Sequence, residues 1–244
     1  MGLWARILQN LVLALLSIVR LRVRVRETLV QYHDAANQSM LFVGITMAFV
    51  GMIGIYQTAS QMAQVLPEYS ALGGAFIQFF VREMGPTMTG LLLATRVGTG
   101  IAAELGSMKV TDQIDAMKLS GVDPVEMLVT PRLISSTVAC LSLATLGTVV
   151  AIFAGCAVAW FGFSVLPDTF LSFRFIRMPD LTMGIVKCVV FGVTVPLISC
   201  SCGLEAEGGS EGVGQATTRA VVWSSFAVIV LDALISFTME IALK

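Results

Sequence analysis

Three charged residues lie inside stretches that are otherwise apolar enough for a membrane, and their side chains are the best placed in this sequence for chemistry. Glu83, Lys187 and Asp232 each interrupt a long hydrophobic run. A charge inside a bilayer is costly, so such residues usually pair with one another or serve a transport pathway. Counted along helices at about 1.5 Å per residue, all three reach a similar depth. We therefore expect one charge cluster in which a single cation compensates two acids.

Two interpretations of this cluster stay open. It is either an ion-pair cluster that holds helices together, or a polar patch in a lipid-binding cavity with Arg82 near a phosphate headgroup. Glycines of the preceding apolar stretch serve either close helix packing or a widened cavity. The residues expected to complete such a cavity are Gly51, Gly54, Tyr56 and Gln57.

A secondary carrier is the alternative class of function. It would use the same three charged residues as an ion or proton relay. Such carriers usually contain repeated halves, and the sequence shows no long internal repeat. The sequence therefore favours a membrane protein without repeated halves over a secondary carrier.

The composition places most of the chain in lipid. Of its 244 residues, 56% are hydrophobic and 13% are charged, with a mean hydropathy of +0.86. Soluble domains carry about 25% charged residues. The net charge of −1 excludes the basic surface that a nucleic-acid-binding protein needs.

Gaps between charges predict the membrane-spanning segments, which must be helical because helices satisfy their own backbone in lipid. We predict an all-α integral membrane protein forming one domain over 1–244. Five transmembrane helices are preceded by an N-terminal amphipathic helix over 3–26. We place this helix in the membrane interface because its apolar stretch is too short to span a bilayer and basic residues follow it. The five predicted spans are 38–63, 73–103, 134–160, 181–202 and 218–242.

Basic residues in the connections predict the orientation, because they collect on the cytoplasmic side. With the N-terminus inside, nine basic residues face the cytoplasm and three face outward. The cytoplasmic set is Arg6, Arg20, Arg22, Arg24, Arg26, Lys109, Lys118, Arg132 and Arg219. The outer set is Arg174, Arg177 and Lys244. We expect a cytoplasmic N-terminus and a C-terminus on the outer side of the membrane, which is the periplasmic side if the protein lies in a bacterial inner membrane.

A short acidic helix is predicted over 111–120, between the second and third spans. Thr111 can cap its start, acids suit its N-terminal end, and Gly121 can end it. Val110, Ile114 and Met117 would form one apolar face. An ordinary surface helix is the plain alternative. A coupling helix that contacts a cytoplasmic ATPase is favoured, with Thr111, Asp112, Gln113, Asp115 and Met117 as its contact residues.

The sequence offers no candidate for catalysis or for a metal site. It contains no Walker lysine motif, and His33 is the only histidine. Cys200 and Cys202 form a Cys-x-Cys pair without further ligands nearby, so buried thiols are the expected state. We expect no enzyme activity and no cofactor in this chain.

Several segments resemble the MlaE/YrbE family, the permeases of ABC transporters that move lipids with MCE-domain proteins. The sequence KVTDQIDA at 109–116 is similar to the coupling-helix motif of that family, in which the first acid is usually Glu and position 117 is usually Leu. The other matching segments are 82–86 (REMGP), 96–98 (RVG), 103–106 (AELG) and 208–222 (GGSEGVGQATTRAVV). Thr95 stands where a smaller residue is common.

The resemblance implies a set of partners and a location. It implies a homodimer of this chain with two ABC ATPase subunits, which bind ATP and magnesium on the cytoplasmic side. It also implies a hexameric MCE-domain protein outside the membrane and often a STAS-domain subunit on the ATPase. The expected cargo is phospholipid in the bacterial inner membrane, moved to maintain outer-membrane lipid asymmetry.

Overall fold

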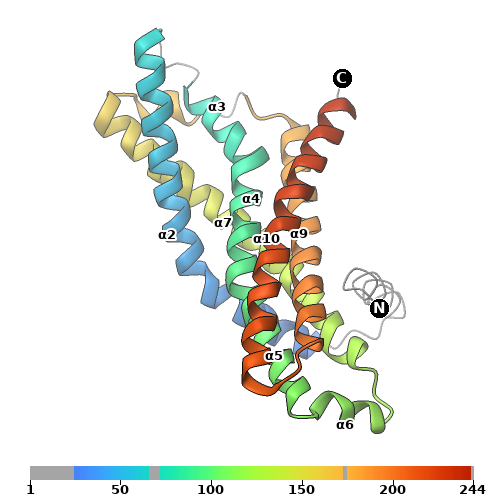
Figure 1. Ribbon diagram of the computed structural model, residues 1–244. Helices are drawn as coiled ribbons and strands as arrows, with labels where there is room; N and C mark the ends of the chain where they lie inside the picture. Colours follow the sequence, from blue (N-terminus) through green and yellow to red (C-terminus); the bar gives the residue numbers. More distant parts are fainter. Residues whose placement is uncertain (1–24, 66–71, 173–174, 243–244) are drawn as a thin grey trace.

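The protein is a bundle of long helices (Figure 1). The computed structural model describes residues 25–65, 72–172 and 175–242, and no strand occurs in these ranges. The interfacial helix predicted over 3–26 lies almost entirely outside them.

Most helices are separate elements along the chain. Helix α2 is Val25–Val65, and α6 is the short Gln113–Leu119. The helices that follow are α7 at Thr130–Phe163, the single-turn α8 at Pro167–Phe170, α9 at Met178–Leu204 and α10 at Gly209–Ala242. A π-helical turn, η3 at Val125–Val129, leads into α7.

A nearly continuous helix lies between α2 and α6 in the sequence and runs through the middle of the bundle (Figure 1). Two π-helical turns divide it into parts. The parts are α3 at Leu72–Phe79, η1 at Phe80–Met84, α4 at Gly85–Leu93, η2 at Ala94–Gly98 and α5 at Thr99–Val110. We call the whole run the central helix.

Four helical segments are long and apolar enough to cross a membrane, so the chain is a multi-pass membrane protein. They are Val25–Met62, Val125–Phe163, Met178–Leu204 and Gly209–Ile241, and they overlap the first, third, fourth and fifth predicted spans. The central helix is not among them, because its charged and polar residues lower its hydropathy. It stays a predicted span, and it runs nearly the full height of the bundle (Figure 1).

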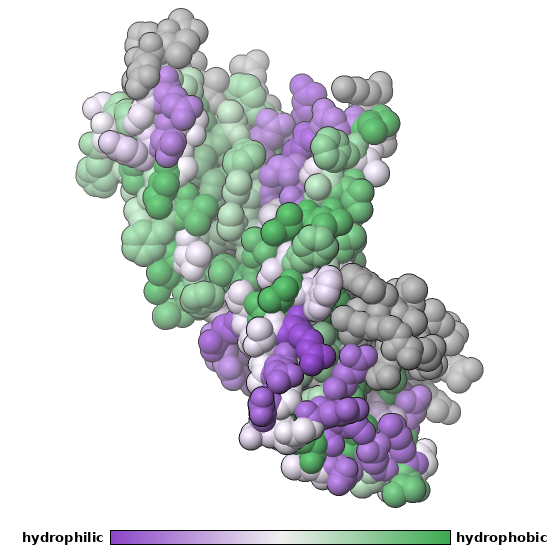
Figure 2. Space-filling model, in the orientation of Figure 1, coloured by the Kyte–Doolittle hydropathy of each residue, from purple (hydrophilic) through white to green (hydrophobic). Residues whose placement is uncertain are grey.

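The surface agrees with this arrangement. Figure 2 shows apolar side chains across the middle of the visible face and hydrophilic ones gathered at its lower end. A second hydrophilic patch extends inward from the upper end. The lower hydrophilic end carries α6 (Figure 1).

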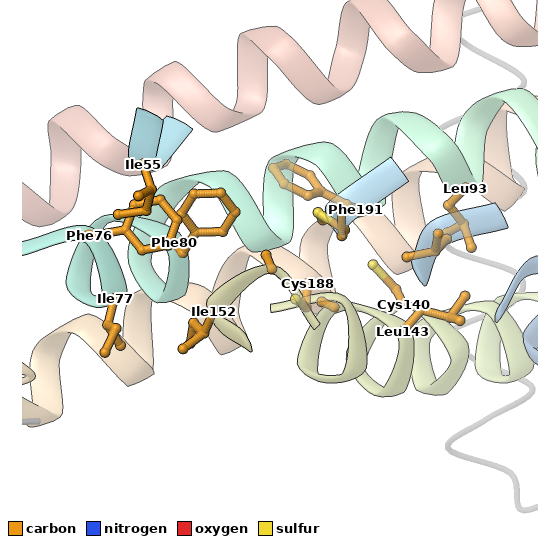
Figure 3. Packing of buried hydrophobic residues seen from close by; sticks show 14 of the residues in the cluster. Ile55, Phe76, Ile77, Phe80, Leu93, Cys140, Leu143, Ile152, Cys188 and Phe191 are labelled. Carbon is orange, nitrogen blue, oxygen red and sulfur yellow. The ribbon is translucent and has the colours of Figure 1, made fainter. Parts of the chain in front are cut away.

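Aromatic and aliphatic side chains fill the space between the central helix, α2, α7 and α9. Ile55, Phe76, Phe80 and Phe191 are buried there (Figure 3). The rings of Phe76 and Phe80 stand 4.5 Å apart between centroids. In lipid no hydrophobic force drives helices together, because acyl chains are as apolar as the side chains. Close packing is therefore a main source of helix association.

Helix α2 packs closely against α7 at Gly51. A Cβ atom added there would lie 2.4 Å from the carbonyl oxygen of Ala151, so only glycine permits this approach. Gly44, two turns earlier on α2, has open space at the same position, with no atom within 4 Å.

We predict that Gly51→Ala destabilises the folded chain by about 1–3 kcal/mol, the usual cost of overpacking. The added methyl group must push α7 backbone away, because backbone cannot move aside as a side chain can. Gly44→Ala is the matched control and should leave stability unchanged or slightly raised. Thermal unfolding of the detergent-purified protein measures both, and equal melting temperatures for the two variants would contradict the close contact.

Candidate functional site

The structure brings Glu83, Lys187 and Asp232 together into one cluster on the central helix, α9 and α10. The Lys187 Nζ atom contacts Glu83 Oε2 and lies 2.7 Å from Asp232 Oδ1. The Lys187 side chain is fully buried, with 0% of its surface exposed. A buried cation needs this compensation, because removing a charge from water costs several kcal/mol in a protein interior.

Two hydroxyl groups extend the cluster, and the sequence reasoning missed both. Lys187 donates to Ser236 Oγ at 2.8 Å, and the Ser236 hydroxyl lies 3.2 Å from Glu83 Oε2. The Thr87 hydroxyl donates to Asp232 Oδ1 at 2.8 Å. The signal was present, since Thr87 follows Glu83 by four positions and Ser236 follows Asp232 by four. Residues at that spacing share one face of a helix.

Arg82 is held by protein carboxylates. Its guanidinium lies 2.5 Å from Glu240 Oε2, 3.4 Å from Glu83 Oε1 and 3.8 Å from Asp180 Oδ1. Asp180 is itself buried and accepts a hydrogen bond from Gln78 at 2.9 Å. The sequence interpretation gave Arg82 no reason for its depth other than a phosphate headgroup, and the three acids supply that reason.

Both Arg82 and Glu83 lie in the π-helical turn η1. Such turns are rare and are frequent at functional sites. The turn is followed by a tight contact, because a Cβ atom on Gly85 would lie 2.2 Å from Thr148 Oγ1 of α7. The central helix is thus pressed against α7 directly after the residues that carry the charges.

The residues of α2 that were expected to line a lipid cavity are either packed against other helices or exposed in the single chain. Gly51 packs on α7, and a Cβ atom on Gly54 would lie 3.3 Å from the Phe76 ring, so both glycines serve helix packing. Tyr56 is 62% exposed, with its ring 6.0 Å from that of Phe163, and Gln57 is exposed as well. Helix α2 packs mainly along α7, and the expected place of these four residues in a lipid cavity stays a prediction.

An apolar cavity of about 530 Å³ lies between the central helix, α7 and α9. Its walls are formed mainly by aliphatic side chains, among them Val81, Leu141, Ile152 and Ile185. On α9 it is bounded by Gly184, Ile185 and Cys188 rather than by Lys187. This cavity suits a hydrocarbon chain, and it is distinct from the one expected beside α2.

Helix α6 begins at Gln113, two residues later than predicted. Thr111 does not cap it; the Thr111 hydroxyl donates to the Ser107 carbonyl at 2.8 Å and so ends α5. Asp112 takes the capping position with φ of 59°. A tight turn between two helices requires this left-handed conformation, which Asp tolerates better than Thr. The helix ends at Leu119, and Gly121 follows it with a φ of +76°.

The apolar side of α6 is anchored and its acidic side is held by lysines. Ile114 is buried against the bundle, and Met117 is half-buried beside it. Asp115 lies 2.8 Å from Lys109 Nζ and 3.2 Å from Lys118 Nζ, and the hydrogen bond to Lys109 is the largest cause of its lowered pKa. These pairs therefore stabilise the turn above the pKa of a free Asp and are lost as pH falls through the lowered value.

Leu119 is the residue of α6 that the sequence reasoning missed. It is 90% exposed at the last position of the helix, and Asp112 and Gln113 are exposed at the other end of the same short segment. Val122, just beyond the helix, is also exposed. Its apolar side chain, at the hydrophilic end of the molecule, is accessible to another protein.

Comparison with known sequences decides the family. A sequence model described as Permease MlaE matches residues 28–238. The chain belongs to the MlaE permease family. It is therefore a membrane subunit of a transporter rather than an enzyme.

Relatives of this MlaE-family permease come from cyanobacteria, plants and Rickettsia. It is 34% identical over 226 residues to a "Probable ABC transporter permease protein" of Synechocystis sp., covering 92% of this chain and 86% of the relative. It is 34% identical over 200 residues to a protein of the same description in Rickettsia typhi, covering 81% and 77%. It is 33% identical over 225 residues to the chloroplast protein TRIGALACTOSYLDIACYLGLYCEROL 1 of Arabidopsis thaliana, covering 91% of this chain but 63% of that protein.

Proposed function

We propose that this MlaE-family permease is the membrane subunit of an ATP-driven transporter that moves phospholipid between the bacterial inner membrane and an MCE-domain partner. The observation that carries the proposal is α6, a short anchored helix that presents Leu119 to solvent between the central helix and α7. A rigid helix with an exposed apolar tip suits docking to a motor subunit. The relatives named as ABC transporter permeases support an ATPase partner.

The proposed assembly follows from this role. Two copies of the chain form a homodimer, two ABC ATPase subunits bind at the end that carries α6, and a hexameric MCE-domain protein lies at the other end. A STAS-domain subunit on the ATPase completes the assembly in some members. Exposed apolar side chains along α10, among them Phe226, Ile229 and Phe237, suit contact with lipid or with a second copy. The proposed role is maintenance of outer-membrane lipid asymmetry.

The proposed orientation places α6 and the N-terminus in the cytoplasm and the C-terminus in the periplasm. The basic residues Lys109, Lys118 and Arg132 lie around the α6 end, as expected for a cytoplasmic face. Figure 1 draws α10 ending at the opposite end of the bundle.

The test is reconstitution of the chain with its ATPase in vesicles that contain fluorescent phospholipid. We expect lipid to move to or from a soluble MCE domain only when ATP is supplied and hydrolysed, with a non-hydrolysable ATP analogue as the control. The alternative, a secondary carrier that uses the Glu83, Lys187 and Asp232 cluster, predicts transport driven by a pH or ion gradient without ATP. Gradient-driven movement in the absence of ATP would overturn the proposal.

A further inference from the structure

A second cavity, of about 230 Å³, lies towards the α6 end of the bundle, between the first turns of α2, the lower part of the central helix and the start of α7. Its lining contains more polar and charged side chains than that of the apolar cavity. The residues that matter here are Gln31, Asp34, Ser39, Arg96, Glu104 and Arg132. None of them belongs to the Lys187 cluster.

Two of the four charges in this lining cancel each other. Arg132 is buried, lies 2.7 Å from Glu104 Oε1 and donates a hydrogen bond to the Leu128 carbonyl at 3.0 Å. It is therefore fully engaged by the protein. The remaining charges are Arg96 and Asp34, one of each sign.

Arg96 and Asp34 share the cavity without pairing to each other. Arg96 makes no ion pair with any residue that the structure describes. The Asp34 Oδ1 atom lies 3.5 Å from Nδ1 of the neighbouring His33. A cation and an anion held apart in one cavity match a ligand that carries both charges.

Two residues of the lining each carry a buried polar atom without a partner among the described residues. Ser39 is 2% exposed, and its Oγ atom has no hydrogen-bond partner among the described residues. The Oε1 atom of Gln31 is likewise buried and unpartnered. Native proteins leave few such atoms without a partner, because each costs free energy. A serine hydroxyl can donate to a phosphate, and an amide oxygen can accept from an ammonium group.

We propose that this cavity binds the headgroup of a zwitterionic phospholipid in the leaflet on the α6 side. Arg96 and Ser39 hold the phosphate, and Asp34 and Gln31 hold the ammonium group. The cavity is smaller than the about 300–1,000 Å³ of pockets that enclose a drug-sized ligand, so it holds the headgroup while the acyl chains stay in the bilayer. The inference rests on the proposed function, because a headgroup site on this side is where a lipid would enter or leave the transporter.

Site-specific photo-crosslinking tests this site. A benzoylphenylalanine at Gln38, which is exposed and lines the cavity, is irradiated in vesicles that contain ³²P-labelled phosphatidylethanolamine. The matched control places the same probe at Asn37, which is also exposed but lines a different depression between α2 and α7. We expect several-fold more labelled lipid at position 38 than at position 37, which reports bulk bilayer contact.

Two variants identify the chemistry. Arg96→Gln should lower capture at position 38 by about tenfold, the effect of losing one charge-assisted hydrogen bond, while Arg96→Lys should retain most of it. Asp34→Asn should lower capture of phosphatidylethanolamine and leave capture of phosphatidylglycerol, which has no ammonium group, unchanged. Elution of each variant as a single species from a sizing column shows that it is folded. If Arg96→Gln fails that check, the comparison of the two lipids with Asp34→Asn decides.

Several results would overturn the proposal. Equal capture at positions 37 and 38, or no response to Arg96→Gln, would leave only bulk lipid. Loss of capture on adding inorganic phosphate would assign the cavity to a soluble anion, and crosslinks to the chain itself would assign it to a protein segment. The vesicles contain neither ATPase nor ATP, so absence of ATP-driven transport would contradict the proposed function without touching this result.

Discussion

Replacing Lys187 with alanine is expected to destabilise the folded chain by about 3–5 kcal/mol, the usual cost of removing one partner of a buried ion pair. Lys187 is fully buried and contacts Glu83, Asp232 and Ser236 at once. Without it, Asp232 keeps only the Thr87 hydroxyl among its described partners. Unfolding of the purified protein in mixed micelles, followed by circular dichroism, measures the loss.

A double-mutant cycle separates the pair from its surroundings. Asp232→Ala alone should also destabilise the folded chain, because the buried Lys187 cation then loses one of its two carboxylate partners. Lys187→Ala combined with Asp232→Ala should be less harmful than Lys187→Ala alone, since the orphaned acid is removed. Strictly additive losses would show that the two groups are not coupled.

The same cycle distinguishes the two interpretations of the cluster. If the double variant recovers both stability and lipid transport, the charges only hold the central helix, α9 and α10 together. If it recovers stability but not transport, the charges also act on the cargo. Ser236→Ala serves as the milder control and should cost about 1 kcal/mol, the typical value for one hydrogen bond.

Replacing Leu119 with aspartate is expected to weaken binding of the ATPase by about 2–4 kcal/mol, the range found for central apolar contacts at protein interfaces. Leu119 is 90% exposed at the end of α6, so the change removes an apolar contact and places a charge in the interface. It disturbs no buried packing in this chain. Co-purification of a tagged ATPase and titration of the two purified proteins measure the effect.

Variants of the acidic residues test the same surface, with one difference that the structure reveals. Asp112→Arg changes an exposed side chain, whereas Asp115→Arg places a third cation beside Lys109 and Lys118 and so disturbs α6 itself. Asp112→Arg is therefore the cleaner partner for Leu119→Asp. Thr169→Asp, exposed at the opposite end of the molecule, is the control and should bind normally. Wild-type recovery of the ATPase with Leu119→Asp plus Asp112→Arg would exclude α6 as the docking site.

The sequence alone determined those features that depend on one helix at a time. Long gaps between charges located the helices now identified as membrane-spanning, because lipid tolerates few charges over such a length. The same rule indicated the cluster, since Glu83, Lys187 and Asp232 each had to find compensation inside the membrane. Gly121 likewise marked the end of α6 locally, because its left-handed conformation favours glycine.

Features that depend on how helices are rotated and paired were decided only by the tertiary structure. Arg82 meets Glu240 and Asp180, which lie on two other helices and are far from it in sequence. Gly51 faces the backbone of α7 instead of a cavity, because close approach of two helices is a property of their pairing. Hydropathy reports the depth of a residue in the membrane but not the direction in which it faces around the helix axis. Which side chains share a cavity or an ion pair therefore followed only from the packing of the helices.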